Sequence, residues 1–366
     1  MKKEKKEEGK GRVKVVIIMV MMVVMMVMGC NSGGVKGEGA AGGGGSGAKS
    51  LSEVLLEVGR SAENVFYSFL ELVSGSLGFA VKATTKKNEV GNYFYGLGKK
   101  LEIASGELEK VAEKASADVD KEGILNKGIR AAVDTAKTTL NILKGHLESL
   151  KGIGGDKKVI DVAKNQNGVA ADKDVLKVVY KALKGMVEVA KGEKVKEPIA
   201  SDVTLAQASI GVDAKDGAKI LATDAAGVAV GEKAALIVSS VRGEEMLASI
   251  VNSTEGDVKE LGAAADVNTT PLGFAVGGTA ANVANAASKA GAVSGGIALR
   301  SLVKEGKLAT HNDDNDHKVV QAVGISAVNK LLVAVEEIVK KTVKNVIEKV
   351  KQEVDKAREP KAVGQQ

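Results

Sequence analysis

The sequence predicts an all-α protein: an elongated helical bundle formed by N-terminal and C-terminal helices, with a region of loops and short helices between them. Apolar residues recur at spacings of three and four over several long segments, which is the period of an α-helix. No alternating strand pattern persists through several segments. The helix formers Ala, Leu, Glu and Lys also dominate the 366-residue chain, so an all-α class is expected.

The first 29 residues have the organisation of a signal peptide. A basic stretch leads into Val15–Met28, a run of Val, Ile and Met that is shorter than the ~20 residues needed to span a membrane. A small residue, Gly29, stands directly before Cys30, as lipoprotein processing requires. We therefore expect cleavage after Gly29 and lipid attachment to Cys30, the only cysteine of the chain. The alternative is that Cys30 is an ordinary small buried residue.

The lipidated Cys30 and residues 31–50 are predicted to form an anchor and a flexible tether. Gly occupies nine of the twenty positions in 31–50, which gives a root-mean-square reach of ~25 Å. An acyl chain contributes ~0.8 kcal/mol per buried methylene, and several chains together give durable attachment. The expected partner of this end is outer-membrane lipid, to which the mature chain would be anchored without spanning it.

Four helices are predicted in the first half of the mature chain. A capping box at Ser50–Glu53 precedes a helix over 51–74, and further helices are expected at 88–116, 122–151 and 172–191. Aromatic side chains concentrate in the first two of these helices and the turn between them, at Phe66, Tyr67, Phe69, Phe79, Tyr93, Phe94 and Tyr95. We expect this cluster to be the core of a helix pair and not a ligand cage.

Residues 192–290 are rich in Ala, Gly, Asp and Thr. Short helices are expected near 204–222 and 231–252, with loops elsewhere, little buried apolar area per residue and tolerance of substitution. Two helices follow at 297–308 and 316–357, and the second would be ~60 Å long. Its apolar face consists of Val328, Leu331, Leu332, Val335, Ile338, Val339, Val343, Val346, Ile347, Val350 and Val354.

We interpret residues 51–358 as a single domain and residues 359–366 as a polar tail. Apolar positions left over on the 328–354 seam would suit a homodimer. The chain carries +6, but seven basic and three acidic residues lie in the predicted leader. The nearly neutral remainder gives no electrostatic footprint for nucleic acid. One cysteine also excludes an internal disulfide framework and a zinc site built from several thiolates.

No motif predicts catalysis or cofactor binding. Gly42–Ser50 resembles a phosphate-binding loop, but Ala48 breaks the required Gly-Lys-Ser adjacency and no strand precedes it. His311–His317 contains two imidazoles and three carboxylates, which suits either a weak surface metal site or, as we favour, a solvated turn before the last helix. His146 stands alone, with no nucleophile partnered by motif. We predict no catalytic, cofactor or metal residues and no enzymatic activity.

Seven segments of the sequence together have a specific order and spacing. They are CNSGG (30–34), FYSFLELVSGSLGF (66–79), TTKK (84–87), VGNYF (90–94), GIALRSLVKEGKL (296–308), SAVNK (326–330) and GQQ (364–366). In this order and spacing they resemble the variable large proteins. These are the larger variable major proteins of relapsing-fever spirochaetes and are related to the variable surface antigen of Lyme-disease spirochaetes. The similarity covers most of the chain and is strongest at its two ends.

The resemblance implies a lipid-anchored antigen on the cell outer membrane, whose expressed copy is exchanged among silent variants so that host antibodies miss the next version. It implies a helical bundle with the chain ends near the membrane and variable loops facing outward. Only Cys30 is carried over as a site residue, bearing the lipid. The alternative from another class is a lipid-anchored adhesin that binds host surface proteins through an exposed patch at the distal end.

Overall fold

The computed structural model describes residues 56–61, 65, 77–115, 124–313 and 315–358. The chain divides into two units, residues 1–47 and 48–366, and every described residue belongs to the second. Among the described residues, extended pairing occurs only as isolated bridges between single residues, and the rest of the regular structure is helical. The all-α prediction is therefore confirmed.

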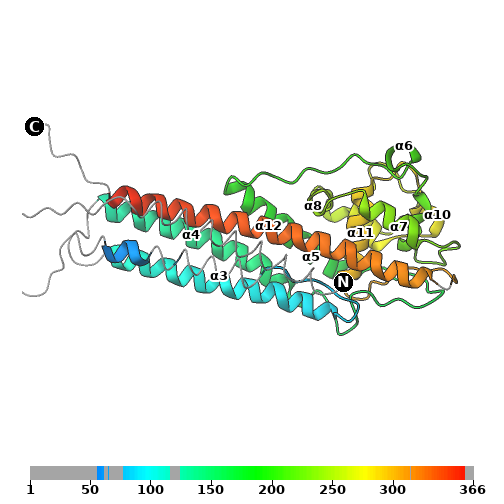
Figure 1. Cartoon of the computed structure of the whole chain (residues 1–366), viewed down its shortest axis with the longest axis horizontal. Coiled ribbons are helices and arrows are strands. Elements are labelled where there is room, and N and C mark those ends of the chain that lie inside the picture. The colour runs from blue at the N-terminus through cyan, green and yellow to red at the C-terminus, as the bar shows by residue number, and fades with distance from the viewer. Residues whose placement is uncertain (1–55, 62–64, 66–76, 116–123, 314, 359–366) are drawn as a thin grey trace, which may run out of the picture. The chain divides into compact units, whose positions relative to one another are not determined.

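The long helices of the described chain are α3 (Lys87–Ala115), α4 (Ile124–Ser149), α5 (Lys173–Gly192) and α12 (Asp316–Arg358). They lie side by side, and α4 contacts each of the other three (Figure 1). Each lies within two residues of its predicted range, because the apolar period holds along the whole segment. Of the helix expected at 51–74, residues 56–61 and 65 are described and are helical. The remainder lies outside the described residues.

The aromatic side chains of Phe79 and Tyr93 connect the segment that precedes α3 to α12. The rings of Phe79 and Tyr93 stack with centroids 4.8 Å apart, and Phe94 is buried. The Tyr93 hydroxyl donates to the Glu336 carboxylate, which also accepts from the backbone N–H of Gly78 at 3.0 Å. For Phe79, Tyr93 and Phe94 the core interpretation is confirmed, whereas Tyr95 is only half-buried and lies under the ammonium of Lys151, 4.1 Å from its ring centroid. Phe66, Tyr67 and Phe69 lie outside the described residues.

Shorter elements fill the chain between α5 and α12. The α-helices are α6 (Gln207–Ile210), α7 (Gly231–Ser239), α8 (Gly243–Val251), α9 (Pro271–Val276), α10 (Ala280–Val283) and α11 (Ala290–Leu302). The 3-10 turns of the described chain are η1 (Leu150–Gly152), η2 (Lys215–Leu221) and η3 (Glu255–Asp257). The two expected helical stretches, 204–222 and 231–252, are therefore each divided into two elements.

The expectation that 192–290 buries little apolar area is wrong. All six residues of α9 are buried, and so are Leu221 and Ile250. Small residues make this possible, because they let backbones approach closely. A Cβ added at Gly296 would lie 2.5 Å from the Cβ of Phe274, and one added at Gly295 would lie 3.0 Å from the Cβ of Pro271. The high content of small residues, from which loops were expected, is therefore a property of a tightly packed interior.

The helix expected at 297–308 is displaced. Helix α11 begins at Ala290 and ends at Leu302, and all thirteen of its residues are buried. Its first two turns consist of Ala, Gly, Ser and Val, which give no amphipathic pattern because every face is covered. Val303 is extended, and the chain then turns through Glu305, which has a positive φ of 63°.

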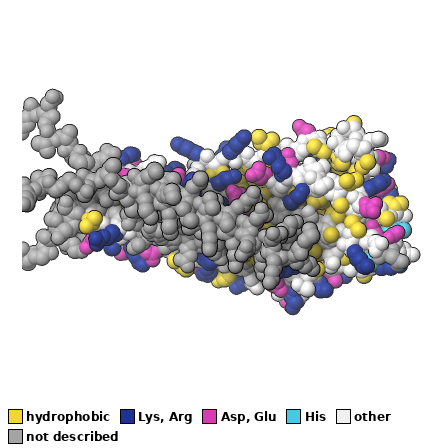
Figure 2. Space-filling model, viewed as in Figure 1, with side chains coloured by type: hydrophobic (Ala, Val, Ile, Leu, Met, Phe, Trp, Pro, Cys, Tyr) yellow, Lys and Arg dark blue, Asp and Glu magenta, His cyan; other side chains and the backbone are white. Residues whose placement is uncertain are grey.

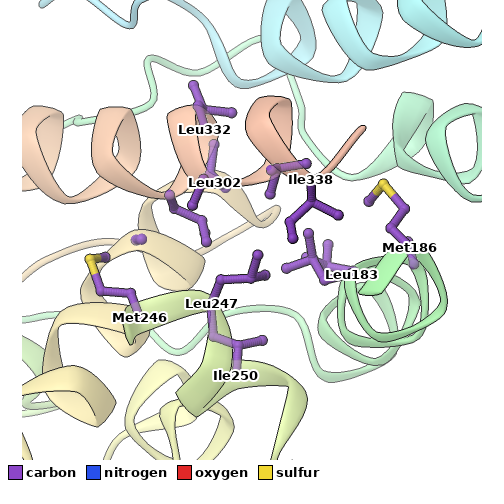
Figure 3. Close-up of a cluster of buried hydrophobic side chains, with 14 of the residues drawn as sticks. Leu183, Met186, Met246, Leu247, Ile250, Leu302, Leu332 and Ile338 are labelled. Carbon is purple, nitrogen blue, oxygen red and sulfur yellow. The ribbon is translucent and has the colours of Figure 1, made fainter. Parts of the chain in front are cut away.

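One hydrophobic core joins the long helices to the short ones. Figure 3 shows side chains of α5, α8, α11 and α12 converging, and they belong to a single buried cluster. They are Leu183, Met186, Met246, Leu247, Ile250, Leu302, Leu332 and Ile338. The apolar residues expected on the face of the last helix are all buried in this chain as well. Because these side chains are already covered within the chain, they do not form the free apolar surface from which a homodimer was predicted.

Candidate functional site

The predicted lipid site, Cys30, and the tether 31–50 lie outside the described residues, so both stay predictions. The structure shows instead where the described chain ends lie. Residues 56–61 and the C-terminal end of α12 lie toward the same end of the long helices (Figure 1). In the described residues, no helix combines the length and apolar character needed to cross a bilayer.

The opposite end carries the short helices and their loops. Apolar side chains on the surface of this region are dispersed over several elements, and Figure 2 shows them interspersed with polar atoms. The large ones that are exposed are Ile199, Val212, Val228, Leu236 and Val267. Such dispersed apolar residues are ordinary for a protein surface and do not by themselves mark a binding site.

Grooves on the described surface include two that are lined in part by charged side chains. One, of about 380 Å³, lies between α4 and α12, where the ammonium of Lys349 pairs with the nearly buried carboxylate of Glu193 at 2.7 Å. The other, of about 750 Å³, lies beside the turn between α7 and α8 and is lined by charged side chains that include Arg242 and Lys330. Neither groove is lined by His or Cys, so neither places a nucleophile beside an imidazole base.

His146 is a packing residue between α4 and α5. Its ring occupies the space that Gly185 leaves open, since a Cβ added at Gly185 would lie 2.2 Å from the imidazole Cε1. Burial lowers the pKa of His146, and the carboxylate of Glu188 opposes the shift.

The predicted turn at His311–His317 is held by its own polar groups. The buried carboxylate of Asp316 accepts hydrogen bonds from the backbone N–H groups of Val230, Gly231 and His311 at 2.8, 2.7 and 2.6 Å. The Nδ1 of His311 accepts from the backbone N–H of Asp313 at 3.2 Å. Asp313 also accepts from the backbone N–H of Asn315 at 3.0 Å, so the side chains of His311, Asp313 and Asp316 support the turn. No described cluster of three or more His, Cys, Asp or Glu could hold a metal.

Arg300 is the largest fully buried side chain of the described residues, and the sequence reading missed it. Its Nε donates to the carbonyl of Ala275 at 2.9 Å, Nη1 to that of Ala222 at 3.3 Å, and Nη2 to that of Phe274 at 3.2 Å. Within the described chain no carboxylate pairs with it. Burial lowers the pKa of Arg300 to about 9, so the guanidinium remains charged at pH 7. Its partners are backbone carbonyls, which tie α9 and the end of η2 to α11.

Lys87 is a second buried cation that is bound by carbonyls. Its Nζ donates to the carbonyls of Val303 at 2.6 Å, Gly306 at 2.8 Å and Arg300 at 3.4 Å. Burial lowers the pKa of Lys87 to about 7, while the nearby carboxylate of Glu305 opposes the shift. The carbonyls at and just beyond the end of α11 form the negative pole of that helix, so a cation at this point stabilises it. Lys87 thus joins the start of α3 to the end of α11.

A signal for Arg300 was present in the sequence. It is the only charged residue between Ala290 and Val303. A lone charge in such a segment is either exposed to solvent at a break in the helix or buried with its donors hydrogen-bonded. No comparable signal existed for Lys87, which follows another lysine in the segment TTKK. Its burial depends on loops that are distant in the sequence.

Comparison with known proteins identifies the family. The model of the Borrelia lipoprotein family matches residues 62–354. Variable large protein 25 of Borrelia hermsii is 62% identical over 321 residues, covering 87% of this chain and 88% of the relative. Variable large protein 18 of the same species is 60% identical over 319 residues, with the same coverage.

A solved structure supports the fold independently. The crystal structure of the Lyme disease variable surface antigen VlsE of Borrelia burgdorferi aligns with a TM-score of 0.68. The alignment covers 83% of this chain and 98% of that chain at 24% sequence identity, so this likeness speaks for the fold alone. The family match and the two close relatives together decide the assignment: this chain belongs to the family of Borrelia lipoproteins that includes the variable large proteins.

Proposed function

We propose that this protein is a lipid-anchored antigen of the outer surface that acts in antigenic variation and immune evasion, without enzymatic activity. The observation that carries the proposal is the identity of about 60% to variable large proteins over 87% of the chain. On this proposal acylated Cys30 holds the protein in the outer membrane, and host antibodies are its partners. The chain ends would then lie nearest the membrane.

The fold suits such a role because its stability depends on buried groups. The hydrogen bonds of Arg300 and Lys87 end on backbone carbonyls, which are present whatever side chain stands at those positions. Exposed positions in 192–290, such as Ile199 and Val212, contribute little to that core. Substitution of such surface residues usually changes the free energy of unfolding by less than about 0.5 kcal/mol. The surface can therefore change while the scaffold is kept.

A comparison of sister copies from one strain tests this proposal. We expect substitutions to concentrate at exposed positions of 192–290 and to spare Lys87, Arg300 and the residues of α11, because changes there expose buried polar groups or create clashes. The measurement is the frequency of substitution at each position, set against its burial. Copies that differed most in the long helices α3, α4 and α12 and least in 192–290 would contradict the antigen proposal.

A further inference from the structure

The chain between α5 and α6 crosses the surface in an extended form. It is fixed at Val195, whose backbone N–H donates to the carbonyl of Ala190 at 2.9 Å, and at Val203, whose carbonyl accepts from the N–H of Ala290 at 2.7 Å. We call residues 196–202, which lie between these two points, the connector. The connector contains no helix, turn or bridge, and Figure 1 shows it within the green trace that leads to α6.

The backbone of the connector is open to an outside partner. None of its N–H or carbonyl groups forms a hydrogen bond with another described residue, so water satisfies them. Its charged side chains form ion pairs at the surface, Glu197 with Lys191 at 2.8 Å and Asp202 with Lys289 at 2.9 Å. Endopeptidases hold a substrate in extended form and pair with its main chain, as an added strand pairs with the edge of a sheet. The connector already has the form that such an enzyme binds.

Pro198 and Ile199 define the middle of the connector. The proline ring fixes its own φ near −65° and favours an extended conformation at Glu197, the residue before it. Ile199 is 69% exposed, which makes it the most exposed large apolar side chain of the described chain. The small residue Ala200 follows it. An extended segment therefore presents one branched aliphatic side chain directly to solvent.

The other exposed aliphatic side chains of the described residues are not presented in this way. Val212 and Val228 each follow a glycine with a positive φ, and Val267 lies in a turn in which the carboxylate of Asp266 accepts from the N–H of Asn268 at 2.9 Å. Each of these segments would have to be straightened to enter a protease. The rest lie in helices or in a backbone bridge, and they are Leu56, Ile103, Ile142, Val169, Val178, Leu236 and Val333.

We propose that an elastase-type serine protease cuts the native protein in the connector, at the bond between Ile199 and Ala200. Enzymes of this type select the residue before the cut bond through a small apolar pocket, which an aliphatic side chain can fill. The reaction consumes one water molecule and breaks the bond between the carbonyl carbon of Ile199 and the nitrogen of Ala200. It leaves a carboxylate on Ile199 and an amine on Ala200.

The lysines in this part of the chain are less suited to a trypsin-type protease. Lys194 has a positive φ of 60°, and the N–H of Val195 that follows it is already hydrogen-bonded. Lys196 stands between Val195, whose side chain is buried, and Glu197, which pairs with Lys191. A protease that requires a basic residue would first have to remove Val195 from the core. The cut is therefore expected after Ile199 and not after a lysine.

This cut would divide the chain without separating its two parts. The first part would contain Cys30 and α3 to α5, and the second would contain the short helices and α12. Helix α4 packs against α12, and the buried ammonium of Lys87 donates to the carbonyl of Val303. The amide of Asn345 donates to the carbonyl of Glu193 at 2.8 Å. The cut leaves these contacts in place, so the cleaved protein should stay assembled. This inference goes beyond the proposed role as an antigen and does not depend on it.

Digestion of the full-length protein with leukocyte elastase, in a non-denaturing detergent, tests the proposal. The wild type should give two persistent fragments, and sequencing of the new N-terminus should read Ala-Ser-Asp-Val, residues 200–203. The two fragments should elute together on size-exclusion chromatography, with the far-UV circular dichroism of the uncut protein.

The variant Ile199→Asp should be cut at least about tenfold more slowly, because a carboxylate does not enter an apolar pocket. Its Tm should equal that of the wild type, since the replaced side chain is exposed. The control Val267→Asp makes the same change in net charge at another exposed aliphatic residue, and it should be cut at the wild-type rate.

A wild type that resists elastase would overturn the proposal, because the connector would then be closed to the enzyme. Degradation to many small peptides, none beginning at Ala200, would also overturn it, since cleavage would then require unfolding. The same holds if Ile199→Asp is cut as fast as the wild type, if Val267→Asp is slowed as much as Ile199→Asp, or if the two fragments separate on the column.

Discussion

Replacement of Arg300 by Met should lower the free energy of unfolding by about 3–5 kcal/mol. The thioether fills much of the same space but removes the donors that satisfy the carbonyls of Ala222, Phe274 and Ala275. A buried acceptor left without a donor costs about 1–3 kcal/mol. Because these carbonyls lie at the junction of α9, η2 and α11, the loss should loosen the whole short-helix region. Urea unfolding followed by circular dichroism measures the change.

The matched control for this variant is Arg242→Met. The Arg242 side chain is 76% exposed and its contact is a 3.5 Å ion pair with Glu245, so the expected loss is below about 1 kcal/mol. Arg300→Lys should also be destabilising, because a single ammonium on a shorter stem does not reproduce the fork of the guanidinium. If Arg300→Met unfolded within about 1 kcal/mol of the wild type, the assignment of Arg300 as a structural tie would be wrong.

Gly277→Ala should cost at least about 4 kcal/mol, since it combines backbone strain with a clash. Gly277 ends α9 with φ of 79° and ψ of −162°, a region that only glycine occupies readily. A Cβ there would lie 2.0 Å from Nη2 of Arg300 and 2.3 Å from the Leu221 carbonyl oxygen. The variant must therefore displace the guanidinium as well as strain the chain. Its denaturant midpoint should fall far below that of the wild type.

Gly211→Ala isolates the backbone contribution. Gly211 ends α6 with a comparable φ of 92°, but nothing lies within 4 Å of the Cβ that alanine would add. We expect a loss of about 1–2 kcal/mol from the left-handed conformation alone. The difference between the two variants combines the crowding around Arg300 with the greater backbone strain at Gly277, whose ψ of −162° lies outside the left-handed region that Gly211 occupies with a ψ of −17°. Similar losses in both would mean that the close approach at Gly277 is of no consequence.

The long helices could be predicted because their apolar period repeats over many turns. Helix α3 buries Val90, Leu97, Leu101 and Leu108 on one face, and the ends expected for it are each one residue from those observed. A seam of that length leaves a pattern that no other secondary structure produces. The prediction needed only local sequence, because each long helix keeps a solvated face.

Helix α11 could not be predicted in this way. It is buried on every side, so its sequence has no polar face, and its Gly and Ala residues resemble those of a loop. What makes it a helix is contact with α9, α8 and α12, which are separated from it in the sequence. The same holds for Lys87, whose carbonyl partners lie more than 200 residues away. Tertiary contacts of this kind leave no periodic trace.

The most direct test of the surface-lipoprotein account is proteolysis of intact cells. We expect added proteinase to remove the wild-type protein from unbroken cells, and Cys30→Ala to abolish labelling with radioactive palmitate and leave the protein protected until the cells are lysed. A wild-type band that survived on intact cells but was digested after lysis would place the protein inside the outer membrane and contradict the account.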